Sequence, residues 1–148
     1  MKTVSFTWVG TIPRTTAQQR RHGRGRSYRS PKHKLAVATW RAICDMYKPD
    51  EPLKGALRLK VSFFFYNPHV RQAIPKLTRP DNTNLIKDVE DALMASGYFA
   101  DDAAIYRTEI EKYWNPYEAV RVELVLDTPA KSESTPSLPS PSPEPDNG

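Results

Sequence analysis

The chain has 148 residues, with 22 Lys and Arg, 17 Asp and Glu, and a formal net charge of +5. That length suits a single domain with its own hydrophobic core. The one cysteine, Cys44, excludes an intrachain disulfide, and the lack of any run of about 18 apolar residues argues against a membrane-spanning helix. We therefore expect a protein of a reducing, cytoplasmic compartment.

The charge is distributed unevenly along the chain. Residues 1–44 contain ten Lys and Arg and no acid, whereas residues 45–127 contain eleven Lys and Arg and fourteen acids. Residues 128–148 contain one lysine and three acids. A basic segment without acids favours a polyanionic partner, and nucleic acid is the most common one.

The first half of the chain predicts a strand, a loop, a helix and a second strand. Residues 4–9 are β-branched and aromatic, which is typical of a strand. Residues 11–34 are polar and basic, with prolines and glycines, and predict a long loop. Residues 57–65 alternate between apolar and polar side chains, which is the pattern of a half-buried strand. Between them, residues 35–47 predict a helix whose apolar stripe comprises Ala36, Trp40, Ile43 and Tyr47.

The second half predicts a loop, a helix and two strands. Residues 67–78 contain prolines and polar residues and form the expected loop. Residues 82–96 have apolar side chains four apart, and Gly97 stands where a helix would end. Residues 104–113 and 117–126 predict two strands joined by a short turn.

This order of elements predicts an α+β domain over residues 1–127, with a mixed β-sheet and two main helices on one face of it. Residues 128–148 are rich in proline and serine and have a single large aliphatic residue, Leu138. Such a segment cannot bury enough apolar surface to offset the entropy of ordering, so we expect a disordered tail.

Polar residues gather at the start of the second predicted helix. Residues 79–93 read RPDNTNLIKDVEDAL, and Asp101-Asp102 follows. Helical spacing puts Lys87 and Asp91 on the face opposite the apolar stripe. Asp81 lies at the mouth of the helix, where free backbone N–H groups favour an anion. A reversal of the chain at Gly97 would carry the Asp101-Asp102 pair back toward the helix start.

Carboxylates beside a lysine, in a chain with a basic segment, indicate metal-assisted hydrolysis of a phosphodiester. Mg²⁺ prefers oxygen ligands and is usually held by one or two carboxylates, waters and a substrate phosphate. The alternative interpretation is structural. Asp81 would then cap the helix, Lys87 and Asp91 would form a surface ion pair, and Asp101-Asp102 would form a turn.

The string RPDNTNLIKDVEDALMASGYFADDAAI resembles the signature of the RusA family of Holliday junction resolvases. That signature has a basic residue, Pro-Asp, a second Asp, Asn-Leu, a lysine, Asp-Ala-Leu and a final Asp-Asp pair. The resemblance implies a RusA-like fold and a homodimeric, Mg²⁺-dependent endonuclease. Such an enzyme would bind branched DNA, specifically four-way junctions, and resolve them by paired nicks during recombination or repair.

The resemblance also implies roles for individual residues. Asp81 and Asp102 correspond to the first and last catalytic aspartates, and Lys87 corresponds to the lysine of the signature. Asn84 and Asp91 correspond to supporting positions of the signature.

The expected metal site departs from the family at one position. The second catalytic aspartate aligns with Thr83, which keeps an oxygen but loses the charge. The implied metal-binding residues are therefore Asp81, Asp102, Asp101 and Thr83, and either Asn82 or Asp101 could compensate for the missing carboxylate.

Basic residues would hold the DNA, chiefly through backbone phosphates. Lys76 and Arg79 flank the carboxylates and are expected to position the scissile strand. The predicted contacts of the N-terminal segment are Arg14, Arg20, Arg21, Arg24, Arg26, Arg29, Lys32 and Lys34.

Two other functions remain open from the sequence. Thr83 motivates a branched-DNA-binding protein with weak or lost catalysis. The basic segment alone also fits a protein that binds RNA or duplex DNA without a preference for junctions.

Overall fold

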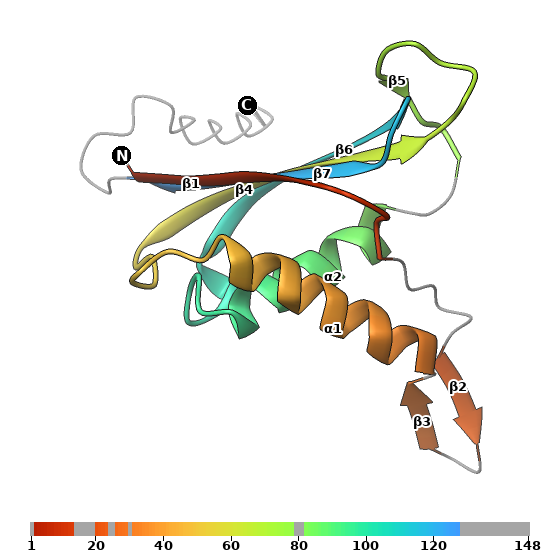
Figure 1. Cartoon of the computed structure of the whole chain (residues 1–148). Coiled ribbons are helices and arrows are strands. Elements are labelled where there is room, and N and C mark those ends of the chain that lie inside the picture. Colours follow the sequence, from red (N-terminus) through yellow and green to blue (C-terminus); the bar gives the residue numbers. More distant parts are fainter. Residues whose placement is uncertain (1, 14–19, 24–25, 30, 79–81, 128–148) are drawn as a thin grey trace, which may run out of the picture.

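The computed structural model describes residues 2–13, 20–23, 26–29, 31–78 and 82–127 (Figure 1). The interpretation of residues 128–148 as a disordered tail lies outside these residues. None of the described helices is long and apolar enough to cross a membrane. The elements in chain order are β1 (Lys2–Val9), β2 (Arg20–Gly23), β3 (Arg26–Arg29), α1 (Pro31–Met46), β4 (Ala56–Tyr66), β5 (Ile74–Pro75), α2 (Asn82–Ala95), the 3₁₀ turn η2 (Asp102–Ala104), β6 (Ile105–Asn115) and β7 (Ala119–Asp127).

The main sheet has five strands in the order β1-β7-β4-β6-β5. Strand β4 pairs in parallel with β6 and antiparallel with β7, and the pairs at both edges are antiparallel. Both helices lie on the same side of this sheet (Figure 1). The prediction of an α+β fold with a mixed sheet and two main helices is thus confirmed, while a homodimer stays a prediction.

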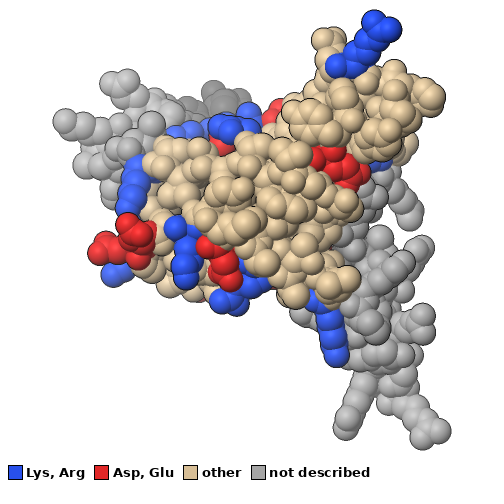
Figure 2. All heavy atoms as spheres, in the orientation of Figure 1, with Lys and Arg blue, Asp and Glu red and all other residues tan. Residues whose placement is uncertain are grey.

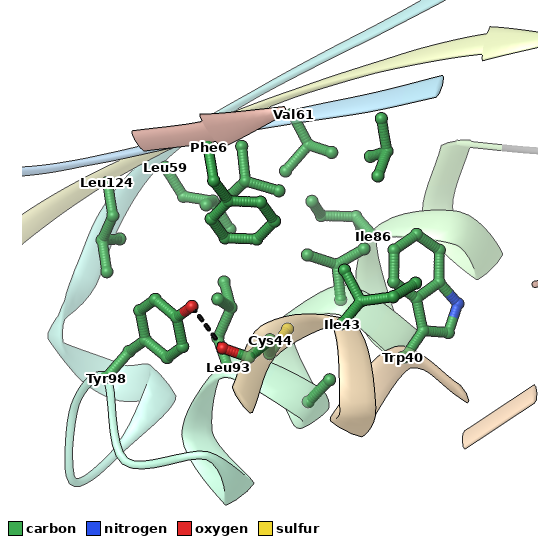
Figure 3. Close-up of a cluster of buried hydrophobic side chains, with 14 of the residues drawn as sticks. Phe6, Trp40, Ile43, Cys44, Leu59, Val61, Ile86, Leu93, Tyr98 and Leu124 are labelled. Carbon is green, nitrogen blue, oxygen red and sulfur yellow. Dashed lines mark hydrogen bonds between the residues drawn. The ribbon is translucent and has the colours of Figure 1, made fainter. Parts of the chain in front are cut away.

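The hydrophobic core lies between the sheet and the helices (Figure 3). It forms because alternate residues of each central strand point to the helices, as the period of two requires. The helices contribute stripes at helical spacing, and these stripes meet the sheet with almost no exposed area. The principal buried side chains are Phe6 of β1, Trp40 and Ile43 of α1, Leu57, Leu59, Val61, Phe63 and Phe65 of β4, Leu85, Val89 and Leu93 of α2, and Val120, Val122 and Leu124 of β7.

Two segments predicted as loops contain strands. Within residues 11–34, β2 and β3 form a separate two-stranded antiparallel sheet, and α1 begins at Pro31 rather than at Leu35. Proline is well tolerated in the first turn of a helix, because the N–H it lacks would have no partner within the helix there. The loop at residues 67–78 includes the short edge strand β5.

The chain just before the basic segment is fixed to the body. Ile12 is 2% exposed, and its N–H donates to Oε1 of Glu118 at 3.0 Å. The indole Nε1 of Trp40, in α1, donates to the carbonyl oxygen of Pro13 at 3.1 Å. The basic segment therefore leaves the body at a defined point beside α1.

Candidate active site and nucleic-acid interface

Helix α2 presents the signature residues as the sequence predicts. Leu85, Val89 and Leu93 are buried against the sheet. Lys87 and Asp91 are exposed on the other side of the helix. The face of α2 that carries the polar residues is thus open to a substrate.

Part of the predicted site lies outside the described residues. Asp81 and Arg79 are not described, and for Asn84 only the helical backbone is described. Thr83 stands in the first turn of α2 and is exposed. The convergence of Asp81 and Asp102 therefore remains a prediction.

A tight reversal follows α2 and brings the aspartate pair back along the helix. Gly97 has φ +89°, the left-handed conformation that glycine adopts at little cost. The N–H of Tyr98 donates to the carbonyl of Leu93 at 3.0 Å, which closes the C-terminal turn. Tyr98 and Phe99 are 0% and 1% exposed, so their rings anchor this turn in the core and do not face a ligand.

The two aspartates differ in environment. The Oδ1 of Asp101 accepts a hydrogen bond from the N–H of Ala103 at 3.0 Å, which caps η2 and lowers the pKa of Asp101. The hydrogen bond between the two carboxyl groups raises the pKa of Asp102, and the negative charges of Asp101 and Asp91 add to the effect. Asp102 is therefore the carboxyl of this pair that more readily keeps a proton.

Glu90 of α2 belongs to the same electrostatic group. Partial burial raises its pKa, and the charges of Asp102 and Asp91 raise it further. The reversal at Gly97 thus places Asp102 beside the third turn of α2, about 14 Å along the helix axis from Asn82 by helix geometry. Among the described residues, Asp102 is thus grouped with Glu90 and Asp91 of the third turn of α2 and not with its first turn.

The donor set suits a hard divalent cation. Among the described residues, no three His, Cys, Asp or Glu side chains lie close enough to hold a metal. Asp101 and Asp102 nevertheless offer carboxylate oxygens, the ligands that Mg²⁺ takes, and a site with one or two carboxylates is usual for this ion. The raised pKa values of Asp102 and Glu90 reflect, in part, repulsion between carboxylates that a bound cation would relieve.

The structural alternative for Lys87 and Asp91 is not supported. Both side chains are exposed, and no ion pair within 4.0 Å joins these two described residues. Lys87 lies one turn before Asp91 on the same face, as the i to i+4 spacing dictates. Its ammonium group therefore remains available to an anionic substrate at this face.

Lys76 lies in the interior and not on the surface. It is 6% exposed, with Nζ 4.0 Å from the ring centroid of Trp114 and 5.4 Å from that of Phe65. Its Nζ donates to Oγ1 of Thr78 at 2.5 Å, and Nζ of Lys112 donates to the carbonyl of Thr78 at 2.8 Å. The expected direct contact between Lys76 and the scissile strand does not fit this burial. A cation held on aromatic rings fits better as an anchor for the segment that leads to α2.

The basic residues of the N-terminal segment occupy several settings. Lys34 is exposed in the first two turns of α1, and Lys32 lies in the same helix, where only its backbone is described. Arg14 and Arg24 lie outside the described residues. The remaining four predicted contacts stand on the backbone of the β2–β3 sheet, namely Arg20, Arg21, Arg26 and Arg29.

Two residues of the site were not predicted. Glu90 follows from no spacing rule, because its proximity to Asp102 depends on the reversal after α2. Lys112 holds Thr78 across 34 positions of sequence. The only local signal was the position of Glu90 next to Asp91, which helical spacing places off the polar face.

Comparison with known proteins agrees with these features. The family model for endodeoxyribonuclease RusA matches residues 11–125, which covers most of the chain, including β4, α2 and the aspartate pair. No curated protein matches the chain.

Proposed function

The chain belongs to the RusA family of Holliday junction resolving endodeoxyribonucleases, and on that premise we propose that it is a Mg²⁺-dependent enzyme that cuts four-way junctions by paired nicks. The observation that supports this most is the return of Asp102 to the polar face of α2. Asp102 interacts there with Asp91, and Asp91 stands one helical turn after Lys87. This arrangement provides carboxylates and a cation on an exposed surface.

Each residue has a distinct task in the proposed reaction. Asp102 and Asp101 would supply carboxylate oxygens to Mg²⁺ beside the third turn of α2, and Asp81 and the hydroxyl of Thr83 would supply oxygen donors at the start of the same helix. When bound, the ion would polarise a phosphoryl oxygen and activate a water for attack. The exposed ammonium of Lys87 would stabilise the negative charge that develops on the phosphate.

Neighbouring residues would orient this group. Asn84 shares the first two turns of α2 with Thr83 and would hydrogen-bond within the site. Asp91 would add negative charge beside Asp102 and so favour a bound cation there. Arg79 would hold the scissile strand beside these carboxylates.

A homodimer fits this function. A four-way junction has two-fold symmetry, so a two-fold dimer presents two identical sites to symmetry-related phosphates. Paired nicks then follow from the symmetry of the complex. The dimer predicts a particle of twice the chain mass in solution, and a monomer at all concentrations would contradict it.

The proposed catalysis is tested with a synthetic four-way junction. Wild type should cut two opposing strands in Mg²⁺, and Asp102→Asn should cut at least a hundredfold more slowly. Asp50→Asn, in the exposed loop after α1, is the matched control and should keep full activity. Equal rates for the two variants would contradict the role of Asp102.

Thr83 supports a second candidate function, a protein that binds branched DNA but cuts it weakly. Thr83 is exposed at the start of α2 and has no charge. Restoring the carboxylate with Thr83→Asp separates the two. A gain in cleavage of roughly tenfold or more would favour the binding protein, and an unchanged rate would favour an enzyme that works with threonine.

A further inference from the structure

The strands β2 and β3 form a small ribbon apart from the main sheet. They pair antiparallel, with Arg20 opposite Arg29 and Arg21 opposite Tyr28. In Figure 1 the ribbon projects beyond the N-terminal end of α1, away from the five-stranded sheet. Strand β3 contacts α1, which follows it directly in sequence.

The body holds the ribbon at both ends of its segment. Before it, the carbonyl of Pro13 accepts the hydrogen bond from Trp40 of α1, and Ile12 is buried. After it, α1 begins at Pro31. The ribbon is thus carried on α1, whose C-terminal part packs in the core through Ile43.

The ribbon is poorly stabilised by its own composition. Its two four-residue strands carry four arginines and no acid. A two-stranded sheet is marginal in water by itself, and like charges at directly opposed positions, such as Arg20 and Arg29, weaken it further. An anionic partner would remove this repulsion.

The body offers no comparable basic surface on the face seen in Figure 2. Lys and Arg side chains there are interspersed with Asp and Glu, and much of the surface is uncharged. Several of the basic residues are paired within the body, among them Arg41 with Asp45, Arg58 with Asp127 and Arg121 with Glu123. Residues 1–44, which include the ribbon, carry ten Lys and Arg and no acid, so a polyanion is attracted chiefly by this part of the chain.

The dimensions of the ribbon select one kind of site on DNA. Two paired strands are about 5 Å apart and four residues are about 13 Å long. The major groove of B-form DNA is about 12 Å wide and admits a two-stranded ribbon, whereas the minor groove is about half as wide. We propose that β2 and β3 enter the major groove of a duplex arm, which brings their basic sequence between the phosphates that line it. This inference rests on the proposed function in one respect, that the polyanion is DNA.

The inference is tested by binding in EDTA, so that no strand is cut. The probes are a short duplex and a four-way junction, each made with cytosine or with glucosylated 5-hydroxymethylcytosine, whose sugar fills the major groove. Wild type should bind the glucosylated probes about tenfold or more weakly. Netropsin, which occupies the minor groove, should leave binding unchanged. Equal affinity for plain and glucosylated DNA would overturn the proposal, whatever any variant does.

A charge variant connects the effect to the ribbon. Arg20→Gln with Arg29→Gln should reduce the slope of log affinity against log salt by about 1.8, because each phosphate contact contributes about 0.9. It should also lose most of its discrimination against glucosylated DNA. The control pair, Lys48→Gln with Lys54→Gln, changes two exposed lysines near the opposite end of α1 and should retain both properties. A slope that falls equally in both variants would contradict a role for the ribbon.

The outcome is separable from that of the cleavage test. If wild type binds glucosylated DNA more weakly but never cuts a junction, the proposal for the ribbon stands and the proposed endonuclease is refuted. If wild type cuts junctions and binds plain and glucosylated DNA equally well, only the proposal for the ribbon is refuted.

Discussion

The hydroxyl of Tyr98 links the loop after α2 to the end of α1, and its removal has a predictable cost. Tyr98 is fully buried, and its Oη donates to the carbonyl of Cys44 at 2.6 Å (Figure 3). Tyr98→Phe keeps the ring and removes this hydrogen bond. The carbonyl of Cys44 still accepts from the N–H of Tyr47 at 3.2 Å, so it is not left without a partner. We therefore expect a loss of about 1 kcal/mol in the free energy of unfolding near pH 7.

The same substitution should lose its effect in alkali. Burial raises the pKa of Tyr98 above its ordinary value of about 10, and the neighbouring Cys44 adds to the shift. Tyr98 therefore ionises at a lower pH in the unfolded chain than in the folded one. The contribution of Tyr98 to stability is complete below about pH 10 and is lost as the pH rises toward the raised pKa. At about pH 10.5, ionisation of Tyr98 stabilises the unfolded wild-type chain by about 0.8 kcal/mol. The Tyr98→Phe chain has no such ionisation, so the difference in stability between the two proteins nearly disappears.

Urea unfolding followed by tryptophan fluorescence measures both quantities. Tyr66→Phe is the matched control, because Tyr66 is 54% exposed, and it should change stability by less than about 0.5 kcal/mol at either pH. The reasoning is refuted if Tyr98→Phe is as stable as wild type near pH 7. It is also refuted if the difference stays the same near pH 10.5.

Two further substitutions probe the supports of the site. Lys76→Met should destabilise the fold by about 1–2 kcal/mol, through loss of the hydrogen bond to Thr78 and of the interaction with the Trp114 ring, and leave the salt dependence of junction binding unchanged. A slope lower by about 0.9 would instead identify Lys76 as a phosphate contact. Gly97→Ala should cost about 1–2 kcal/mol in thermal unfolding, because φ is +89° while a Cβ would meet no atom within 4 Å. An unchanged melting temperature would count against that conformation.

Elements with a strong apolar period were predictable from the sequence. The alternation over residues 57–65 corresponds to β4, whose inward residues are all buried. The stripe of α2 and its end at Gly97 were equally clear, since both follow from local spacing and from the conformational freedom of glycine.

The ribbon was not predictable by the same means. Its strands contain arginine, serine and glycine with almost no apolar residue, so no period of two is visible. Its pairing rests on backbone hydrogen bonds between β2 and β3. The segment therefore predicts a loop, and the role of its charge in DNA binding stays a prediction.

The site was predictable in its residue types but not in its long-range contacts. The polar face of α2 follows from spacing, which placed Lys87 and Asp91 correctly. The burial of Lys76 depends on Trp114, which lies on another strand of the sheet, and no local pattern reports it. The grouping of Glu90 with Asp102 likewise depends on the path of the chain after α2.

The most direct test of the account is strand cleavage by the wild-type chain on a synthetic four-way junction. Denaturing gels of junctions labelled on each strand in turn would show where nicks occur. We expect symmetric nicks in two opposing strands in Mg²⁺ and none in EDTA. Intact strands across a range of Mg²⁺ and Mn²⁺ concentrations, in a preparation that binds the junction, would contradict the proposed endonuclease.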